Sequence, residues 1–143
     1  MKLNESFGYI INRTARNMKK SLDAEIKRFD ITTSQWSILK LLSEQDELTQ
    51  VEIAEKLSSD KATTGSVIDK LANKKLVYRE QCESDKRAYR ICMSPYGIEL
   101  VDRLSYEAVK CNKKALEGFN ENEVQQLVEY LHRIDNNLNK EAK

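Results

Sequence analysis

The chain has 143 residues and a formal net charge of +1, with 33% charged and 40% hydrophobic residues. This length suits one domain with a real core, and the balanced charge argues against a disordered chain and a uniformly basic tail. No apolar run reaches the roughly 18 residues that a membrane span needs, so we expect a cytoplasmic protein without membrane partners.

The first thirty residues predict one long amphipathic helix. Apolar residues recur at three- or four-residue intervals, which places them on one face of a helix over roughly residues 3 to 29. A shorter second helix is expected to follow, because Thr32 and Gln35 have the spacing of a capping box ahead of Trp36 and further apolar residues.

Two more short helices with a tight connection are predicted next. Thr49 and Glu52 repeat the capping signature, and "SSD" offers three candidate N-caps for a fourth helix over "KATTGSVIDKLANK". Its buried face is expected to carry Thr64, Val67, Ile68 and Leu71. Two short helices joined by about three residues, the second with small polar and basic groups on its free face, are typical of a helix-turn-helix.

A charged hairpin is predicted directly after these helices. "LVYRE" and "AYRICM" have the alternation of strands, and the polar "QCESDKR" between them suits a hairpin tip. The alternation directs Tyr89, Ile91 and Met93 to one face, and Arg90 and Cys92 to the other. Residues 60 to 90 hold eight Lys or Arg against five Asp or Glu, a net of +3, so the basic charge gathers here.

Two long helices are expected to complete the chain. Ser94 and Pro95 suit the N-cap and first residue of one, and Asn120 with Glu123 caps the last. The terminal helices present more apolar surface than the small central unit covers, which predicts pairing with another copy of the chain. The expected fold class is mainly α with a small β-hairpin wing, that is, a winged helix-turn-helix flanked by long N- and C-terminal dimerisation helices.

A helix-turn-helix followed by a charged hairpin indicates binding to double-stranded DNA. The short side chains of the fourth helix fit a major groove, with hydroxyls at base edges and lysines on phosphates. Arg87 at the tip suits a minor groove, flanked by phosphate contacts and oriented by an acid. Gly65 has two interpretations, close approach of the backbone to DNA or a tolerated surface glycine. The predicted DNA-binding residues are Lys61, Ala62, Thr63, Gly65, Ser66, Lys70, Asp85, Lys86, Arg87 and Arg90.

From "DITTSQWSILKLL" to "SDKRAYRICMSPYGIEL" the chain resembles the multiple antibiotic resistance regulator (MarR) family of winged helix-turn-helix transcriptional regulators. Asp85 and Arg87 match that family's Asp-x-Arg wing motif, and "MSPYG" resembles its Leu-Thr-x-x-Gly. Lys75 departs from the pattern, because the family commonly has glycine there. We therefore expect residues 1–143 to form a single MarR-like chain, with residues 1–30 and 95–143 as dimerisation helices and residues 31–94 as the DNA-binding region.

The resemblance also implies how such a protein works. Members of the family are homodimers that bind a pseudo-palindromic site, often as repressors released by a small phenolic or other anionic ligand or by thiol oxidation. Their ligands bind where the dimerisation helices meet the winged domain, which makes Arg13, Arg16 and Trp36 candidate contacts of a small anionic or aromatic effector. A solvated basic face and a core tryptophan are the alternatives for these residues.

Two other interpretations stay open, a winged helix that binds only protein and a redox-responsive regulator acting through Cys82. Cys82 is the one cysteine expected to be exposed, although its acidic neighbours disfavour a thiolate. The single His132 lacks a cysteine at ligand spacing, so no metal site is expected. Neither a nucleophile with its base nor a glycine-rich phosphate loop is present, so we expect no enzyme and no cofactor.

Overall fold

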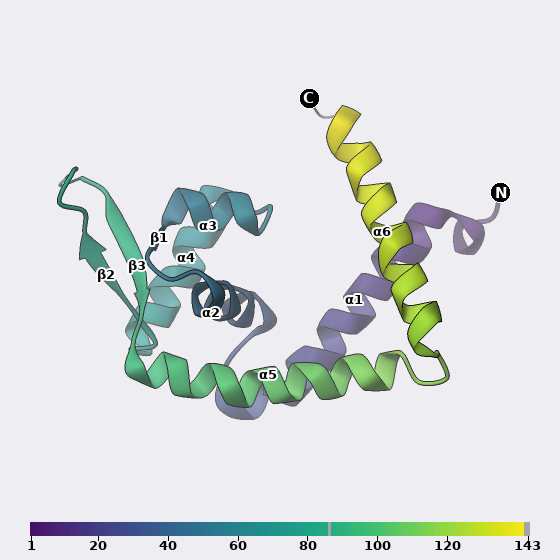
Figure 1. Ribbon diagram of the computed structural model, residues 1–143, viewed down its shortest axis with the longest axis horizontal. Coiled ribbons are helices and arrows are strands. Elements are labelled where there is room, and N and C mark those ends of the chain that lie inside the picture. Colours follow the sequence, from purple (N-terminus) through teal and green to yellow (C-terminus); the bar gives the residue numbers. More distant parts are fainter. Residues whose placement is uncertain (86, 142–143) are drawn as a thin grey trace. The chain divides into compact units, whose positions relative to one another are not determined.

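The computed structural model describes residues 1–85 and 87–141 and confirms a mainly α fold with a β wing (Figure 1). Its elements in chain order are η1 Leu3–Glu5, α1 Phe7–Ile26, η2 Lys27–Phe29, α2 Thr33–Glu44, β1 Leu48–Thr49, α3 Gln50–Lys56, α4 Lys61–Asn73, β2 Val77–Gln81, β3 Tyr89–Met93, α5 Pro95–Ala115 and α6 Glu121–Glu141. The chain divides into two compact units, Met1–Cys111 and Asn112–Lys143.

The single helix predicted for residues 3 to 29 is three segments, so that boundary was wrong. Ser6 has extended backbone (φ −69°, ψ 124°), which separates the 3-10 turn η1 from α1. At the other end, α1 tightens into η2 and stops at Asp30, whose φ of 58° is left-handed. Aspartate tolerates this conformation better than most residues, and the Lys74 ammonium donates to the Asp30 carbonyl.

The predicted N-caps of the central helices are confirmed. Thr32 and Gln35 bond reciprocally at the start of α2, and Thr49 and Glu52 do so at the start of α3. Asp60, the last residue of "SSD", accepts from the Thr63 backbone N–H at 2.7 Å and opens α4. Each cap satisfies a backbone donor that would otherwise lack a partner, which is worth about 1 kcal/mol.

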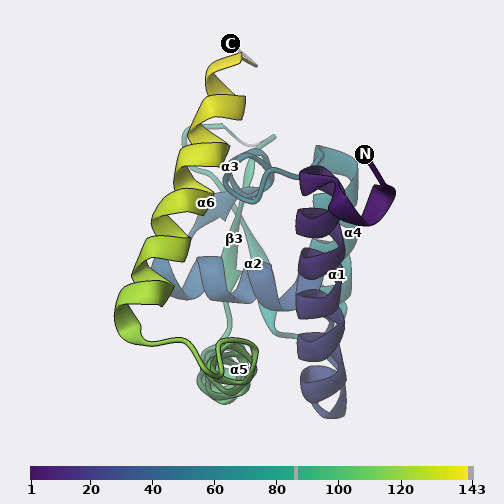
Figure 2. The ribbon, with the colours of Figure 1, turned by 90° about the vertical axis from the view of Figure 1, so that its right-hand side faces the viewer.

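The core of the first unit lies around α2. This helix contacts α1, α4 and β3, and Figure 2 shows it running across the direction of α1. Trp36 is 8% exposed and belongs to this core, together with residues that are at most 2% exposed: Ile26, Leu39, Leu42, Ile68, Leu71, Leu76 and Ile91. α4 is therefore held by apolar contacts on its inner side, as its sequence pattern predicted.

The sheet has three antiparallel strands in the order β1-β3-β2. The hairpin pairs Val77 with Met93 at its base and Gln81 with Tyr89 toward its tip. The two-residue β1, which pairs Leu48 with Ile91, was not predicted, because two residues show no periodicity. Ile91 and Met93 point inward as expected, but Cys92 is buried as well, on the opposite face.

The turn between α4 and the wing keeps a left-handed residue without glycine. Lys75 has a φ of 63°, a conformation that costs a non-glycine residue about 1 kcal/mol. Glycine is required where the first turn of α5 passes the residue before β2, since a Cβ on Gly97 would lie 2.3 Å from the Leu76 carbonyl oxygen. Ser94 caps α5 as predicted, with its hydroxyl accepting from the Gly97 N–H at 3.0 Å.

An ion pair with a buried carboxylate joins η2 to α5. Glu107 is 2% exposed, and its carboxylate bonds Arg28 and lies 3.4 Å from the Lys110 ammonium. A buried carboxylate is costly without such partners, so the pair constrains where η2 lies on α5.

The second unit contains α6, whose start matches the predicted cap. Asn120 and Glu123 bond each other's backbone N–H at 2.9 and 3.0 Å. The apolar residues along α6 are all at least partly exposed within the single chain, with Leu127, Val128, Leu131 and Leu138 the most prominent. Of the helices described, none combines the length and the apolar character that crossing a membrane requires.

Candidate nucleic-acid interface

The free face of α4 carries the predicted contacts as exposed side chains. Thr64, Ile68 and Leu71 turn into the core, and the opposite side is therefore left to solvent. The exposed residues there are Lys61, Ala62, Thr63, Ser66 and Lys70. The Thr63 hydroxyl donates to the Asp60 carboxylate at 2.8 Å, so its oxygen remains available to accept from a partner.

The structure explains the glycine at position 65 in a way that neither sequence interpretation included. A Cβ at Gly65 would lie 2.6 Å from Nε2 of Gln50, the first residue of α3. That amide crosses α4 and donates to the Lys61 carbonyl oxygen at 3.0 Å. Glycine at position 65 thus makes room for the link between α3 and α4, and no signal within α4 itself could have revealed it.

An ion pair between α4 and the wing was also missed. Arg79 of β2 bonds the carboxylate of Asp69 on α4, ten residues earlier. The pair lies beside a cleft of about 320 Å³ whose lining includes Gln50, Lys61, Arg79, Arg87 and Tyr89. The cleft therefore has basic side chains on both the helix and the wing side, which suits a polyanion.

The wing tip has the predicted contact between Asp85 and Arg87. Asp85 Oδ1 accepts from the backbone N–H of Arg87 at 3.0 Å and lies 3.4 Å from its Nε. The Arg87 side chain is 93% exposed, so it extends into solvent from a turn closed by its neighbour. Lys86, predicted to contact phosphate, lies outside the described residues. Arg90 donates from Nη1 to the Glu47 carbonyl at 3.0 Å, so its guanidinium is partly engaged within the protein.

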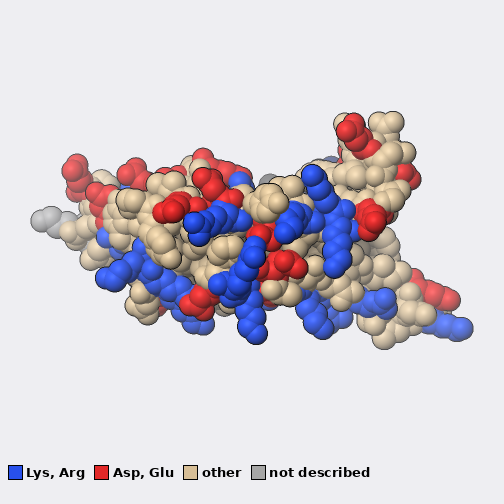
Figure 3. All heavy atoms as spheres, turned by 90° about the horizontal axis from the view of Figure 1, so that it is seen from below, with Lys and Arg blue, Asp and Glu red and all other residues tan. Residues whose placement is uncertain are grey.

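The distribution of basic side chains differs from one face of the molecule to another. In the view from the α5 side, Lys and Arg side chains are interspersed with Asp and Glu (Figure 3). One carboxylate, that of Asp60, lies at the N-cap of α4, where hydrogen bonds from the backbone N–H and hydroxyl of Thr63 lower its pKa. That carboxylate caps the helix, and the basic residues Lys61 and Lys70 follow it along α4.

The candidate effector residues do not come together. Arg13 and Arg16 are exposed on α1, whereas Trp36 is a core residue. A separate cavity of about 490 Å³ lies between α1, α2 and α4, and its lining includes Lys19, Lys27 and Lys70. At its edge, partial burial opposes ionisation of Asp23, but hydrogen bonds from Thr33 and the charge of Lys19 outweigh this and lower its pKa.

The expectation that Cys82 is exposed was wrong. Cys82 is 8% exposed, because its N–H bonds the Ala88 carbonyl at 2.9 Å and continues the hairpin one residue beyond β2. Cys92 and Cys111 are buried too. A redox response through an accessible Cys82 therefore loses its premise. Within the described residues, the one set of donors close enough to share a metal ion is Glu47, Glu80 and Cys92, at the base of the wing.

Comparison with known proteins identifies the fold. Residues 31–89 match the model of the MarR family. The S. aureus MepR structure, solved as a DNA complex, is 28% identical and superposes with a TM-score of 0.86 over 92% of this chain and 98% of that chain. A probable transcriptional regulator from Pseudomonas aeruginosa is 23% identical, with a TM-score of 0.86 over 93% and 99% of the two chains.

A third solved structure is similar over most of its length. CouR from Rhodococcus jostii, bound to p-coumaroyl-CoA, is 20% identical, with a TM-score of 0.83 over 94% of each chain. The family match covers the helix-turn-helix and most of the wing, and the structural similarity extends over the flanking helices. The winged helix-turn-helix region, residues 31–89, therefore matches the MarR family, and the chain has the fold of these solved transcriptional regulators.

Proposed function

We propose that this chain is a sequence-specific DNA-binding repressor that places α4 in the major groove and the wing in the minor groove. The observation that carries the proposal is the exposed face of α4, short and polar, beside a wing whose Arg87 extends from an Asp85-closed turn. Thr63 and Ser66 would meet base edges, while Lys61 and Lys70 pair with phosphates. The DNA complex of MepR supports this assignment, since that protein is similar over nearly the whole chain.

The proposed repressor acts as a homodimer on a pseudo-palindromic operator. In the second unit Leu127, Val128 and Leu131 are between 38% and 46% exposed, and in the first unit Phe7 and Ile10 are 60% and 45% exposed. Apolar residues repeated along a helix at such exposure are typical of a surface that another copy covers. Residues 1–30 and 95–143 of the two protomers would then form the dimer interface. The DNA-binding region of each protomer, residues 31–94, would bind one half-site.

A small anionic effector is part of the proposal. CouR, which has a similar fold, was solved bound to p-coumaroyl-CoA, an aromatic and anionic ligand, and this supports the proposal. In this chain the cavity lined by Lys19, Lys27 and Lys70 has the charge for such a molecule, and Lys70 also lies on the proposed DNA-binding face of α4. An anion held there would compete with phosphate for Lys70, which gives a physical route from effector to release.

The proposal is tested by sequencing the genomic DNA fragments that the purified protein retains in the presence of excess non-specific DNA. We expect one palindromic motif, with two half-sites about one helical turn apart. Ser66→Ala together with Thr63→Ala should remove the motif but leave weak, salt-sensitive binding. Leu131→Glu should give monomers in light scattering and lose the motif as well.

Three outcomes would contradict parts of the proposal. Retention of random fragments would leave a non-specific DNA binder, and no retention would favour a winged helix that binds only protein. A Leu131→Glu variant that still binds as a dimer would show that α6 does not form the interface. Glu129→Gln is the matched control on the same helix and should behave as the unaltered chain.

A further inference from the structure

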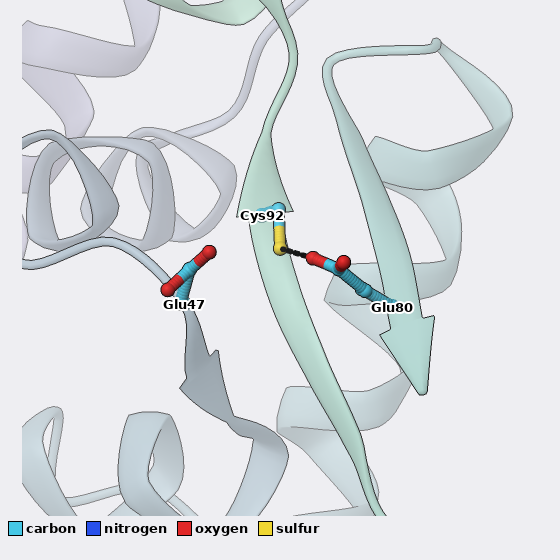
Figure 4. Close-up of side chains that lie close together, drawn as sticks. All are labelled: Glu47, Glu80 and Cys92. Carbon is cyan, nitrogen blue, oxygen red and sulfur yellow. Dashed lines mark hydrogen bonds between the residues drawn. The ribbon is translucent and has the colours of Figure 1, made fainter. Parts of the chain in front are cut away.

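A thiol and two carboxylates converge at the base of the wing, on the sheet face opposite Ile91. Glu47 precedes β1, Glu80 lies in β2 and Cys92 lies in β3. One donor atom from each of the three residues lies within 4.8 Å of the other two. Figure 4 shows the Cys92 sulfur between the two carboxylates, with Glu80 on one side and Glu47 on the other.

The Cys92 side chain is buried and directed into this cluster. It is 1% exposed, and Sγ lies 3.5 Å from Glu80 Oε2 and 4.0 Å from the Arg90 carbonyl oxygen. Both of these neighbours are acceptors, and the Tyr78 side chain also interacts with the thiol across the β2–β3 pair. The sulfur therefore contributes a soft donor atom to a site whose other polar atoms are oxygens.

The electrostatics of the site favour a cation. Glu47 and Glu80 place two carboxylates beside the buried sulfur, and Asp46 is the neighbour of Glu47 in the chain. Arg90 does not neutralise these carboxylates through the contact that it makes, because its Nη1 donates to the backbone carbonyl of Glu47. A divalent ion would offset the negative charge of these carboxylates.

We propose that Glu47, Glu80 and Cys92 bind a divalent cation of the zinc class, with solvent completing the coordination. Magnesium and calcium prefer all-oxygen sites, whereas a thiolate with carboxylates suits Zn²⁺ or Cd²⁺. Binding forms a metal–sulfur bond and breaks the S–H bond, and the proton passes to solvent without any redox change. Glu47 and Glu80 are exposed, so their side chains can close on the fixed sulfur to the roughly 2.0 to 2.3 Å that zinc requires.

The experiment is a titration of the full chain with Cd²⁺ in the absence of DNA, following the thiolate-to-cadmium charge-transfer absorbance. We expect saturation at one ion per chain, displacement by Zn²⁺ and no displacement by excess Mg²⁺. Because no DNA is present, the result does not depend on the proposed function. Absence of the band in the unaltered protein would overturn the proposal.

Variants assign the ligands. Cys92→Ser should abolish the band, and Glu47→Gln and Glu80→Gln should each weaken Cd²⁺ binding by about tenfold or more while leaving a thiolate band. The matched controls Cys82→Ala, Cys111→Ala and Glu83→Gln should bind as the unaltered protein does. Since both glutamates are exposed, their variants decide the matter even if Cys92→Ser fails to fold. A band that persists in folded Cys92→Ser, or unchanged affinity in both glutamate variants, would refute the site.

Discussion

The free face of α4 and the tip of the wing both present polar and basic side chains, but their supports differ. α4 is anchored from behind by Thr64, Ile68 and Leu71, each at most 2% exposed. At the wing tip the exposed Arg87 side chain is supported by its contact with Asp85, without apolar burial of its own. Apolar burial holds a helix over a wide range of salt and pH, whereas an exposed ion pair is worth at most about 1 kcal/mol.

This difference teaches how the two proposed DNA contacts should respond to change. The position of α4 depends on the core of the whole unit, so altering its inner face should change stability and binding together. The wing tip lies outside that core, so altering it should change binding alone. Each of the following variants tests one side of this separation.

The largest effect is expected from Ile68→Ala. Ile68 is fully buried, and removing its side chain leaves a cavity that should lower the free energy of unfolding by about 2 to 5 kcal/mol. Ser66→Ala, on the exposed side of the same helix, should change it by less than about 0.5 kcal/mol. Urea unfolding followed by circular dichroism measures both. Equal losses would show that α4 is not anchored through its inner face.

Arg87→Ala should weaken DNA binding by about 1 to 3 kcal/mol without a change in unfolding. If the guanidinium enters a minor groove, the loss should be larger on operators with A·T-rich flanks, where the groove is narrow and its potential more negative. Lys70→Ala, a proposed phosphate contact, is the control and should weaken both operators alike. Fluorescence anisotropy on two operators differing only in their flanks decides between a groove contact and a phosphate clamp.

Asp85→Ala should act through Arg87 and cost less, at most about 1 kcal/mol of binding. Because the two residues form one contact, the double variant should bind about as weakly as Arg87→Ala alone. The same anisotropy titration supplies the four affinities of the cycle. Additive losses would mean that Asp85 contributes to DNA binding independently of Arg87.

Gly65→Ala should change stability by different amounts in two backgrounds. Alanine favours a helix over glycine by up to about 1 kcal/mol, but its Cβ displaces the Gln50 amide from the Lys61 carbonyl. We expect little net change in the unaltered chain and a gain of about 0.5 to 1 kcal/mol in a Gln50→Ala background. Thermal unfolding of the four proteins gives the coupling. If Gly65→Ala changes the stability equally in both backgrounds, the position of the Gln50 amide does not depend on glycine at residue 65.

The smallest effect concerns the cap of α4 at low pH. Hydrogen bonds from Thr63 lower the pKa of Asp60 in the folded chain, so the cap's contribution is complete above the unfolded pKa, near about 4. It is lost as the pH falls through the lower, folded value. Asp60→Asn keeps a capping oxygen that does not ionise in this range, so its urea midpoint should fall less steeply with acid. Parallel curves for the two proteins would contradict this assignment.

Local patterns in the sequence were sufficient for the central helices and their starts, although they missed the breaks at Ser6 and after Ile26 in the first predicted helix. Thr32, Thr49 and Asp60 cap the helices that they were predicted to cap, because capping depends on residues only three apart in the chain. The hairpin and the inward side of α4 follow from periodicity for the same reason. The resemblance to the family rested on these regions as well, and it is confirmed.

The tertiary structure decided the features that depend on residues far apart in the chain. β1 exists because Leu48 meets Ile91 across forty-three positions, and Cys82 is buried because the hairpin continues past β2. The partner of Glu107 is Arg28, seventy-nine residues away, which no spacing rule selects. Likewise Glu47 and Cys92 approach each other only after β1 joins β3. Sequence alone therefore predicted the parts with short-range causes, while long-range packing determined which side chains share a site.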